Sequence, residues 1–243
     1  QTGYEQADML MPIVFLVILG TIAVSGLSAW PLVRWLGLAD PNPQGVLFVG
    51  AHPCGRVLAA ALRDQGIRVV LLDTNFTHVH AAREQGLEAH KSNVLIRRTF
   101  ERLELIGLGY ALVITSNEEA NALAALHLQE IFERKAVFQL SPEAPTESEG
   151  ADSQLEHGRT LFEKNLTYDE LARRIDRGWT VEATQITEEF TFEQFNDRFA
   201  ERALPLFVVD SQGRLNIATV DRPLEPAAGD TLIFLRSPEA EEK

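Results

Sequence analysis

The stretch that decides the fold is VLFVGAHPCGRVLAAALRDQGIRVVLLDTN, residues 46–75. An apolar run reaches Gly50, a helical pattern opens near Gly55, and a second apolar run ends at Asp73. A strand, a glycine-bearing turn, a helix and a second strand, in this order, are typical of the opening unit of a dinucleotide-binding fold. The stretch departs from the G-x-G-x-x-G pattern at one position, because the middle glycine is replaced by His52.

Each residue of this loop has an expected task. Gly50 permits the tight turn after the strand, and Gly55 lets the helix and the strand approach closely. The position of His52 normally lacks a side chain so that the backbone can approach a pyrophosphate, and Pro53 removes an amide that would donate to phosphate. The free amides at the start of the helix still favour an anion. The sequence therefore predicts a nucleotide site at Gly50, His52 and Gly55 with an incomplete phosphate cradle.

Further candidate ligand contacts follow other expected strands. Asp73 closes the second strand, where a carboxylate can accept both hydroxyls of an adenosine ribose; alternatively, it caps the helix that follows. Thr115 lies at the carboxyl end of a later strand, the edge where such sheets bind ligands. Ser116 and Glu119 are expected to form a capping box there. Asn121 either contacts the ligand or ties down a neighbouring loop.

Apolar runs and helical patterns alternate beyond this unit and predict a doubly wound parallel sheet. The expected strands are residues 46–49, 68–72, 88–90, 110–115 and 136–140, and the expected helices are residues 55–65, 77–85, 95–105 and 118–132. The last block differs, because capping boxes at Thr167–Glu170 and Thr191–Gln194 start helices that precede strand-like runs. Those runs are residues 206–210, 215–219 and 231–235. We expect an α/β chain that ends in a small α+β domain.

The N-terminal segment has a different character. Residues 9–33 contain no charged side chain over 25 positions. As a helix with a rise of ~1.5 Å per residue, this segment covers roughly 37 Å, which exceeds the bilayer core of about 30 Å. Acidic residues precede it, whereas a signal peptide would begin with basic ones. Trp30, Arg34 and Trp35 flank its far end, so we expect a transmembrane helix with the C-terminal bulk in the cytoplasm.

Composition excludes several classes of function. The single cysteine excludes a disulfide framework, and the six histidines lack the spacing of a metal site. Residues 142–243 carry twenty-two acidic and eleven basic side chains, whereas nucleic-acid binding needs a basic surface. We also find no catalytic triad and no hydride-transfer domain, so we expect neither an enzyme nor a nucleic-acid-binding protein. Since both methionines lie inside the apolar segment, we expect a piece of a longer protein.

Five stretches together resemble a known arrangement. FLVILGTIAVSGLSAWPLVRWLGL, residues 15–38, resembles the last transmembrane helix of NhaP-like monovalent cation:proton antiporters. Residues 46–75 and LVITSNEEANALAALHLQEIFERKAVFQLSP, residues 112–142, resemble the RCK (TrkA-N) domain that follows this helix in some members. LPLFVVDSQGRLN, residues 204–216, and LEPAAGDTLIFL, residues 224–235, are similar to the small domain after RCK.

The resemblance implies a division of the chain and a ligand. The expected parts are a transmembrane helix at 1–36, a linker at 37–45, an RCK domain at 46–141, an acidic linker at 142–158 and a small domain at 159–243. RCK domains of this kind bind NAD(H) or an adenine nucleotide and adjust transport by the membrane domain. This chain departs from the family at His52, and at Asn93, where members often carry an aspartate after the third strand. Asn93 is therefore a further expected ligand contact.

The resemblance also implies a location and partners. We expect the bacterial inner membrane, with the residues after about 37 in the cytoplasm. The expected partners are the lipid bilayer, the rest of the antiporter membrane domain and a second copy bound through the RCK domain. The fragment would not exchange sodium or potassium for protons by itself. Two alternatives remain open: a structural assembly domain with a vestigial nucleotide pocket, and a soluble NAD-dependent oxidoreductase.

Overall fold

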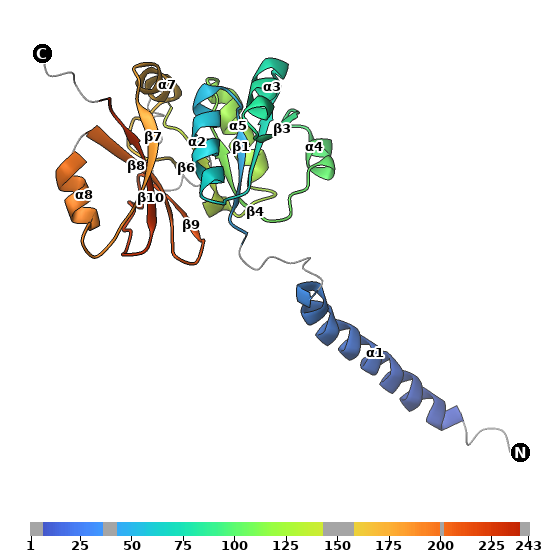
Figure 1. Cartoon of the computed structure of the whole chain (residues 1–243). Helices are drawn as coiled ribbons and strands as arrows, with labels where there is room; N and C mark the ends of the chain where they lie inside the picture. The colour runs from blue at the N-terminus through green and yellow to red at the C-terminus, as the bar shows by residue number, and fades with distance from the viewer. Residues whose placement is uncertain (1–6, 36–42, 143–157, 200–201, 239–243) are drawn as a thin grey trace, which may run out of the picture. The chain divides into compact units, whose positions relative to one another are not determined.

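The computed structural model describes residues 7–35, 43–142, 158–199 and 202–238. The chain divides into two compact units, Gln1–Asn42 and Pro43–Lys243 (Figure 1). Most of the expected linker at 37–45, and nearly all of the expected acidic linker at 142–158, lie outside the described residues. Each unit is considered separately.

The first unit contains helix α1, Ala7–Trp35. Its stretch Met11–Ala29 has a mean hydropathy of 2.2, and the side chains in that stretch are exposed. The hydroxyl groups of Thr21 and Ser28 donate to backbone carbonyls of the same helix, which satisfies them without water. The helix is therefore long and apolar enough to cross a membrane.

We expect the full chain to partition into the detergent phase of a cloud-point separation, whereas a chain that begins at Gln44 stays in the aqueous phase. The reason is that α1 exposes 19 consecutive residues of high hydropathy. A matched control replaces Ile18 and Ile22 by aspartate, because each charge at the centre of a span costs about 2.5–3.5 kcal/mol on insertion. A full chain that stays monodisperse in buffer without detergent would contradict the prediction.

The second unit begins with a six-stranded parallel sheet, as the alternating pattern predicts. Its strands are β1 Gly45–Val49, β2 Val69–Asp73, β3 Glu88–Lys91, β4 Leu108–Val113, β5 Val137–Gln139 and β6 Arg159–Thr160. Their order across the sheet is β3-β2-β1-β4-β5-β6, so the direction of winding reverses between β1 and β4. In sheets of this kind the crevice at the reversal is the usual place for a ligand.

Helices cover both faces of this sheet. They are α2 Pro53–Asp64, α3 Phe76–Glu84, α4 Arg97–Arg102, α5 Glu118–Leu128 and the short η1 Arg134–Ala136. In β1, Val46 and Phe48 join the apolar core that contains α2 and α3, whereas Leu47 and Val49 join the core that contains α5. Because both faces are buried, the central strands β1 and β2 read as apolar runs rather than alternating ones.

The remaining elements form a four-stranded antiparallel sheet in the order β7-β10-β8-β9 with two helices. These elements are α7 Tyr168–Asp176, β7 Thr180–Gln185, α8 Phe192–Phe199, β8 Ala203–Val209, β9 Leu215–Ile217 and β10 Thr231–Arg236. We call residues 159–238 the C-terminal block. The predicted α+β character of this block is confirmed.

The capping box expected at Thr191 and Gln194 is confirmed, and at Thr167 the hydroxyl half of the expected box is present. The Thr167 hydroxyl accepts from the Glu170 amide at 3.2 Å, and Thr191 and Gln194 exchange side-chain to backbone hydrogen bonds at 3.3 and 3.1 Å. The box expected at Ser116 and Glu119 is wrong. Asn117 caps α5 instead, because its side chain accepts from the Ala120 amide at 2.7 Å.

The C-terminal block is tied directly to the parallel sheet. Its first residues form β6, which pairs with β5 in parallel. The Tyr110 hydroxyl of β4 donates to the Leu215 carbonyl at 3.3 Å, and one apolar core extends through both sheets. Helix α2 contacts both α7 and β7. As a result, α7 lies next to the loop that the sequence singles out as a nucleotide site.

Candidate functional site

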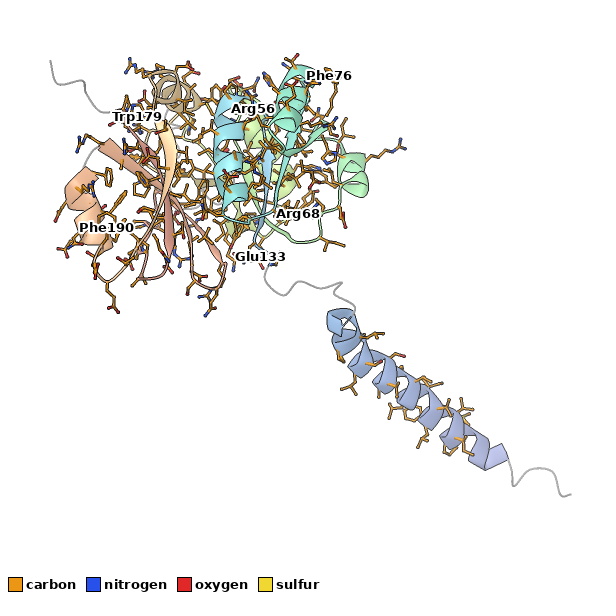
Figure 2. All side chains as sticks on the ribbon, viewed as in Figure 1. Arg56, Arg68, Phe76, Glu133, Trp179 and Phe190 are labelled. Atoms are coloured by element: carbon orange, nitrogen blue, oxygen red, sulfur yellow. The ribbon has the colours of Figure 1, made fainter. Side chains whose placement is uncertain are left out.

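The candidate site lies at the carboxyl ends of β1, β2 and β4. Figure 2 places Arg56 and Phe76, at the starts of α2 and α3, toward one end of the sheet, and Arg68 and Glu133, which precede β2 and β5, toward the other. All the strands of this sheet are parallel, so the loops that follow them meet at one edge.

The turn between β1 and α2 has no space for side chains at its two glycines. Gly50 has a φ of +113°, and a Cβ there would lie well under 3.0 Å from the carbonyl oxygen of Ile114. A Cβ on Gly55 would meet the carbonyl oxygen of Gly50 equally closely. These are the tight turn and the close approach that the sequence predicts for the two positions.

The His52 side chain turns into the fold rather than toward solvent. It is 6% exposed, its Nε2 donates to the Ile114 carbonyl oxygen, and its ring meets Tyr168 edge-on at 4.6 Å between centroids. Burial lowers the pKa of His52 and outweighs the raising effects of that hydrogen bond and of Asp73. The ring is therefore neutral near pH 7, and its buried Nδ1 has no hydrogen-bond partner among the described residues.

The Asp73 carboxylate accepts hydrogen bonds from the loops that follow β1 and β2. It accepts from the backbone amides of Ala51 and Asn75, both at 2.8 Å, and from His78 Nδ1 at 3.0 Å. Burial alone would raise the pKa of Asp73, but these hydrogen bonds more than compensate and hold it below its usual value. Asn75, not Asp73, caps α3 through the Thr77 amide. A carboxylate offers about four acceptor positions, so Asp73 keeps capacity for a ligand hydroxyl.

Three further candidates are engaged in local contacts. The Thr115 hydroxyl donates to Asn121 Oδ1 at 2.5 Å, and Asn121 Nδ2 donates to the Thr115 carbonyl at 2.9 Å. Asn121 is buried, so it ties down the loop after β4, the second of its two expected roles. Asn93 follows β3 and accepts from the Leu95 amide at 2.9 Å, which stabilises a turn.

The structure thus brings part of the expected set together. Gly50, His52, Gly55 and Asp73 surround one loop, and Thr115 follows Ile114, which His52 contacts. Asn93 lies one strand beyond Asp73. Sequence reasoning missed Tyr168, which comes from the C-terminal block. The capping box marked the start of its helix but carried no signal that the helix returns to this loop.

One family model matches this part of the chain. Residues 46–143 match the family model of the TrkA-N domain. We call these residues the TrkA-N segment. The segment contains β2 to β5, β1 apart from its first residue, and every site residue expected from the sequence. No curated protein matches the chain.

Several solved structures resemble the chain at low sequence identity. The NAD(P)-binding domain of an exopolyphosphatase-related protein from Archaeoglobus fulgidus has 13% identity and a TM-score of 0.42, with 55% of this chain and 94% of that one covered. The TrkA-N domain of inner membrane protein ybaL from Escherichia coli has 19% identity and a TM-score of 0.36, covering 40% and 71%. The GsuK channel bound to NAD has 13% identity and a TM-score of 0.39, and the chain spans 50% of its length.

Proposed function

We propose that the second unit is a regulatory module that binds an adenine nucleotide, NAD(H) or ADP, in the crevice between the ends of β1 and β4. The observation that carries this proposal is the β1–α2 turn, where no side chain fits at Gly50 or Gly55, with the ionised Asp73 bound to the same turn. The TrkA-N match of this segment supports it.

Different residues of the site would bind the phosphate and the ribose of the nucleotide. The first amides of α2 and the Arg56 guanidinium, which now donates to the Ala51 carbonyl at 2.8 Å, would bind phosphate. The remaining acceptor position of Asp73 would bind one ribose hydroxyl. The site fits the ribose half of the ligand as it stands, whereas the phosphate half requires the His52 ring to move.

The membrane part of the proposal rests on α1. We propose that α1 is the last transmembrane helix of a sodium or potassium/proton antiporter in the bacterial inner membrane, and that the module controls ion exchange from the cytoplasm. The span Met11–Ala29 and the resemblance to NhaP-like antiporters support this. The fragment would need the upstream helices to transport ions. A second copy of the chain is the expected partner of the apolar side chains exposed on α5, Leu123 and Leu126.

Calorimetric titration of the full chain in detergent tests the ligand. We expect saturable binding of at least one of ADP, NAD⁺ and NADH, and weaker binding of GDP as the base-specificity control. The same titration of a Gly55→Val variant should show no binding, because the added side chain would collide with the Gly50 carbonyl. Absence of binding by all three adenine nucleotides to the unmodified chain would refute the proposal.

A structural assembly domain with a vestigial pocket is the second candidate, and the buried His52 ring favours it. On this view no nucleotide binds and the exposed Leu123 and Leu126 hold two copies together. Sedimentation of a Leu123→Asp, Leu126→Asp variant in parallel with the titration separates the two functions. Assembly alone would be favoured if the variant no longer forms dimers and the unmodified chain binds no nucleotide.

A further inference from the structure

We propose that the His52 ring is a built-in occupant of the nucleotide crevice, and that its departure on nucleotide binding releases α7 of the C-terminal block. This inference rests on the proposed nucleotide site. It assigns to His52 and Tyr168 a regulatory contact between the TrkA-N segment and the C-terminal block.

The position of the ring supports its role as an occupant. His52 follows β1, and the Ile114 carbonyl that it contacts follows β4, so the ring bridges the two strands between which the winding reverses. A ligand of a doubly wound sheet enters at this crevice. The ring therefore fills the space through which the backbone at position 52 would approach a phosphate.

Two contacts hold the His52 ring in the crevice, but one of its nitrogen atoms lacks a hydrogen-bond partner among the described residues. One hydrogen bond to Ile114 and the edge-on contact with Tyr168 fix it. Its Nδ1 is buried without a partner among the described residues, and an unsatisfied buried acceptor is unfavourable. An apolar side chain would fill this space without that cost, so the histidine makes an occupant that a ligand can displace.

Tyr168 connects the occupant to the C-terminal block. It is the first residue of α7, and Arg174 of the same helix donates to Glu163 at 2.6 Å. The Arg174 guanidinium also lies over the Trp179 ring, 5.2 Å from its centroid. Trp179, labelled in Figure 2, directly precedes β7. A ring that leaves the crevice removes the partner of Tyr168 at the N-terminal end of α7. Nucleotide occupancy would therefore loosen α7 from α2.

Cys54 provides a reporter for this movement. It is the single cysteine of the chain and lies two residues after His52, 2% exposed. Burial, followed by the nearby Asp176 of α7, raises the pKa of its thiol to about 11. The thiol is therefore shielded from reagents while α7 packs against α2. Displacement of α7 would expose the thiol and lower its pKa.

The first experiment measures ADP affinity of the full chain in detergent for His52→Ala, Tyr168→Ala and the double variant. His52→Ala removes both the hydrogen bond and the ring contact that ADP must otherwise break, so ADP should bind about fivefold to a hundredfold more tightly. Tyr168→Ala removes the ring contact alone, so ADP should bind about two- to tenfold more tightly. The double variant should equal His52→Ala, because Tyr168 acts only through the ring. His127→Ala, which removes another partly buried imidazole on α5, should leave affinity unchanged.

The second experiment follows maleimide labelling of Cys54. We expect saturating ADP to accelerate labelling severalfold in the unmodified chain, and His52→Ala to label rapidly with or without ADP. Tyr168→Leu replaces the alanine variant if that one fails to fold.

The outcomes separate this inference from the proposed function. Equal ADP affinities of the unmodified chain and His52→Ala overturn the occupant while nucleotide binding stands. Labelling that ADP leaves unchanged or slows in the unmodified chain overturns the link to α7. Failure of the unmodified chain and of every variant to bind any adenine nucleotide overturns both this inference and the proposed function.

Discussion

Replacement of Gly50 by alanine is expected to lower the free energy of unfolding of the second unit by about 2–5 kcal/mol. The new Cβ would lie well under 3.0 Å from the Ile114 carbonyl oxygen, and the residue would keep a φ of +113°. Backbone atoms on two adjacent strands would have to separate to make room. Urea titration of a chain that begins at Gln44, followed through the fluorescence of Trp179, measures the change.

Gly66→Ala is the matched control. Gly66 also has a positive φ, +80°, but nothing lies within 4 Å of its would-be Cβ. Alanine there suffers only the conformational penalty, about 1–2 kcal/mol. If Gly50→Ala is no more destabilising than Gly66→Ala, the close approach of β1 and β4 at this turn is not a constraint on the fold.

Asp73→Ala is expected to weaken ADP binding by about tenfold to over a hundredfold, because it removes a charge-assisted hydrogen bond to the ribose worth roughly 1.5–3 kcal/mol. The same change also releases the Ala51 amide, which Asp73 now holds at 2.8 Å. Calorimetry on the full chain measures the affinity. The loss of affinity can thus arise from the missing bond to the ribose or from the loosened loop. A change in the ligand, rather than a second change in the protein, separates the two causes.

Titration with 2′-deoxy-ADP makes this distinction. If Asp73 binds the ribose, the unmodified chain prefers ADP over 2′-deoxy-ADP and Asp73→Ala loses most of that preference. If Asp73 only closes the loop, the variant binds both ligands more weakly by the same factor. Equal affinity of the unmodified chain and the variant for ADP would remove Asp73 from the site altogether.

The sequence predicts the parallel sheet well because its signals are local. Apolar runs and the threonines that cap α7 and α8 each act within a few residues, and the glycines of the first turn are recognised by their spacing in the motif. The misplaced cap has an equally local reason, since Ser116 and Asn117 are adjacent and both are good capping residues. β7 was missed because its half-exposed residues lack a clear apolar face, and β6 because it has two residues.

The candidate site was predictable only in part. The roles of Gly50 and Gly55 in the turn follow from backbone geometry that the motif itself encodes. The inward turn of the His52 ring depends on Tyr168, 116 positions away in the sequence, and no periodic pattern reports such a pairing. The hydrogen bonds between Thr115 and Asn121 could not be predicted from the sequence, because both side chains can equally well bind a ligand.

The pairing of β6 with β5 has a consequence for the engineering of chimaeras from this protein. Residues 159–160 belong to the C-terminal block in sequence but complete the edge of the parallel sheet. A graft joined between 143 and 157 would exchange that edge strand together with part of the apolar core beneath it. Recombination should therefore succeed at Pro43, the first residue of the second compact unit, and fail between 143 and 157 unless the donor supplies a compatible sixth strand.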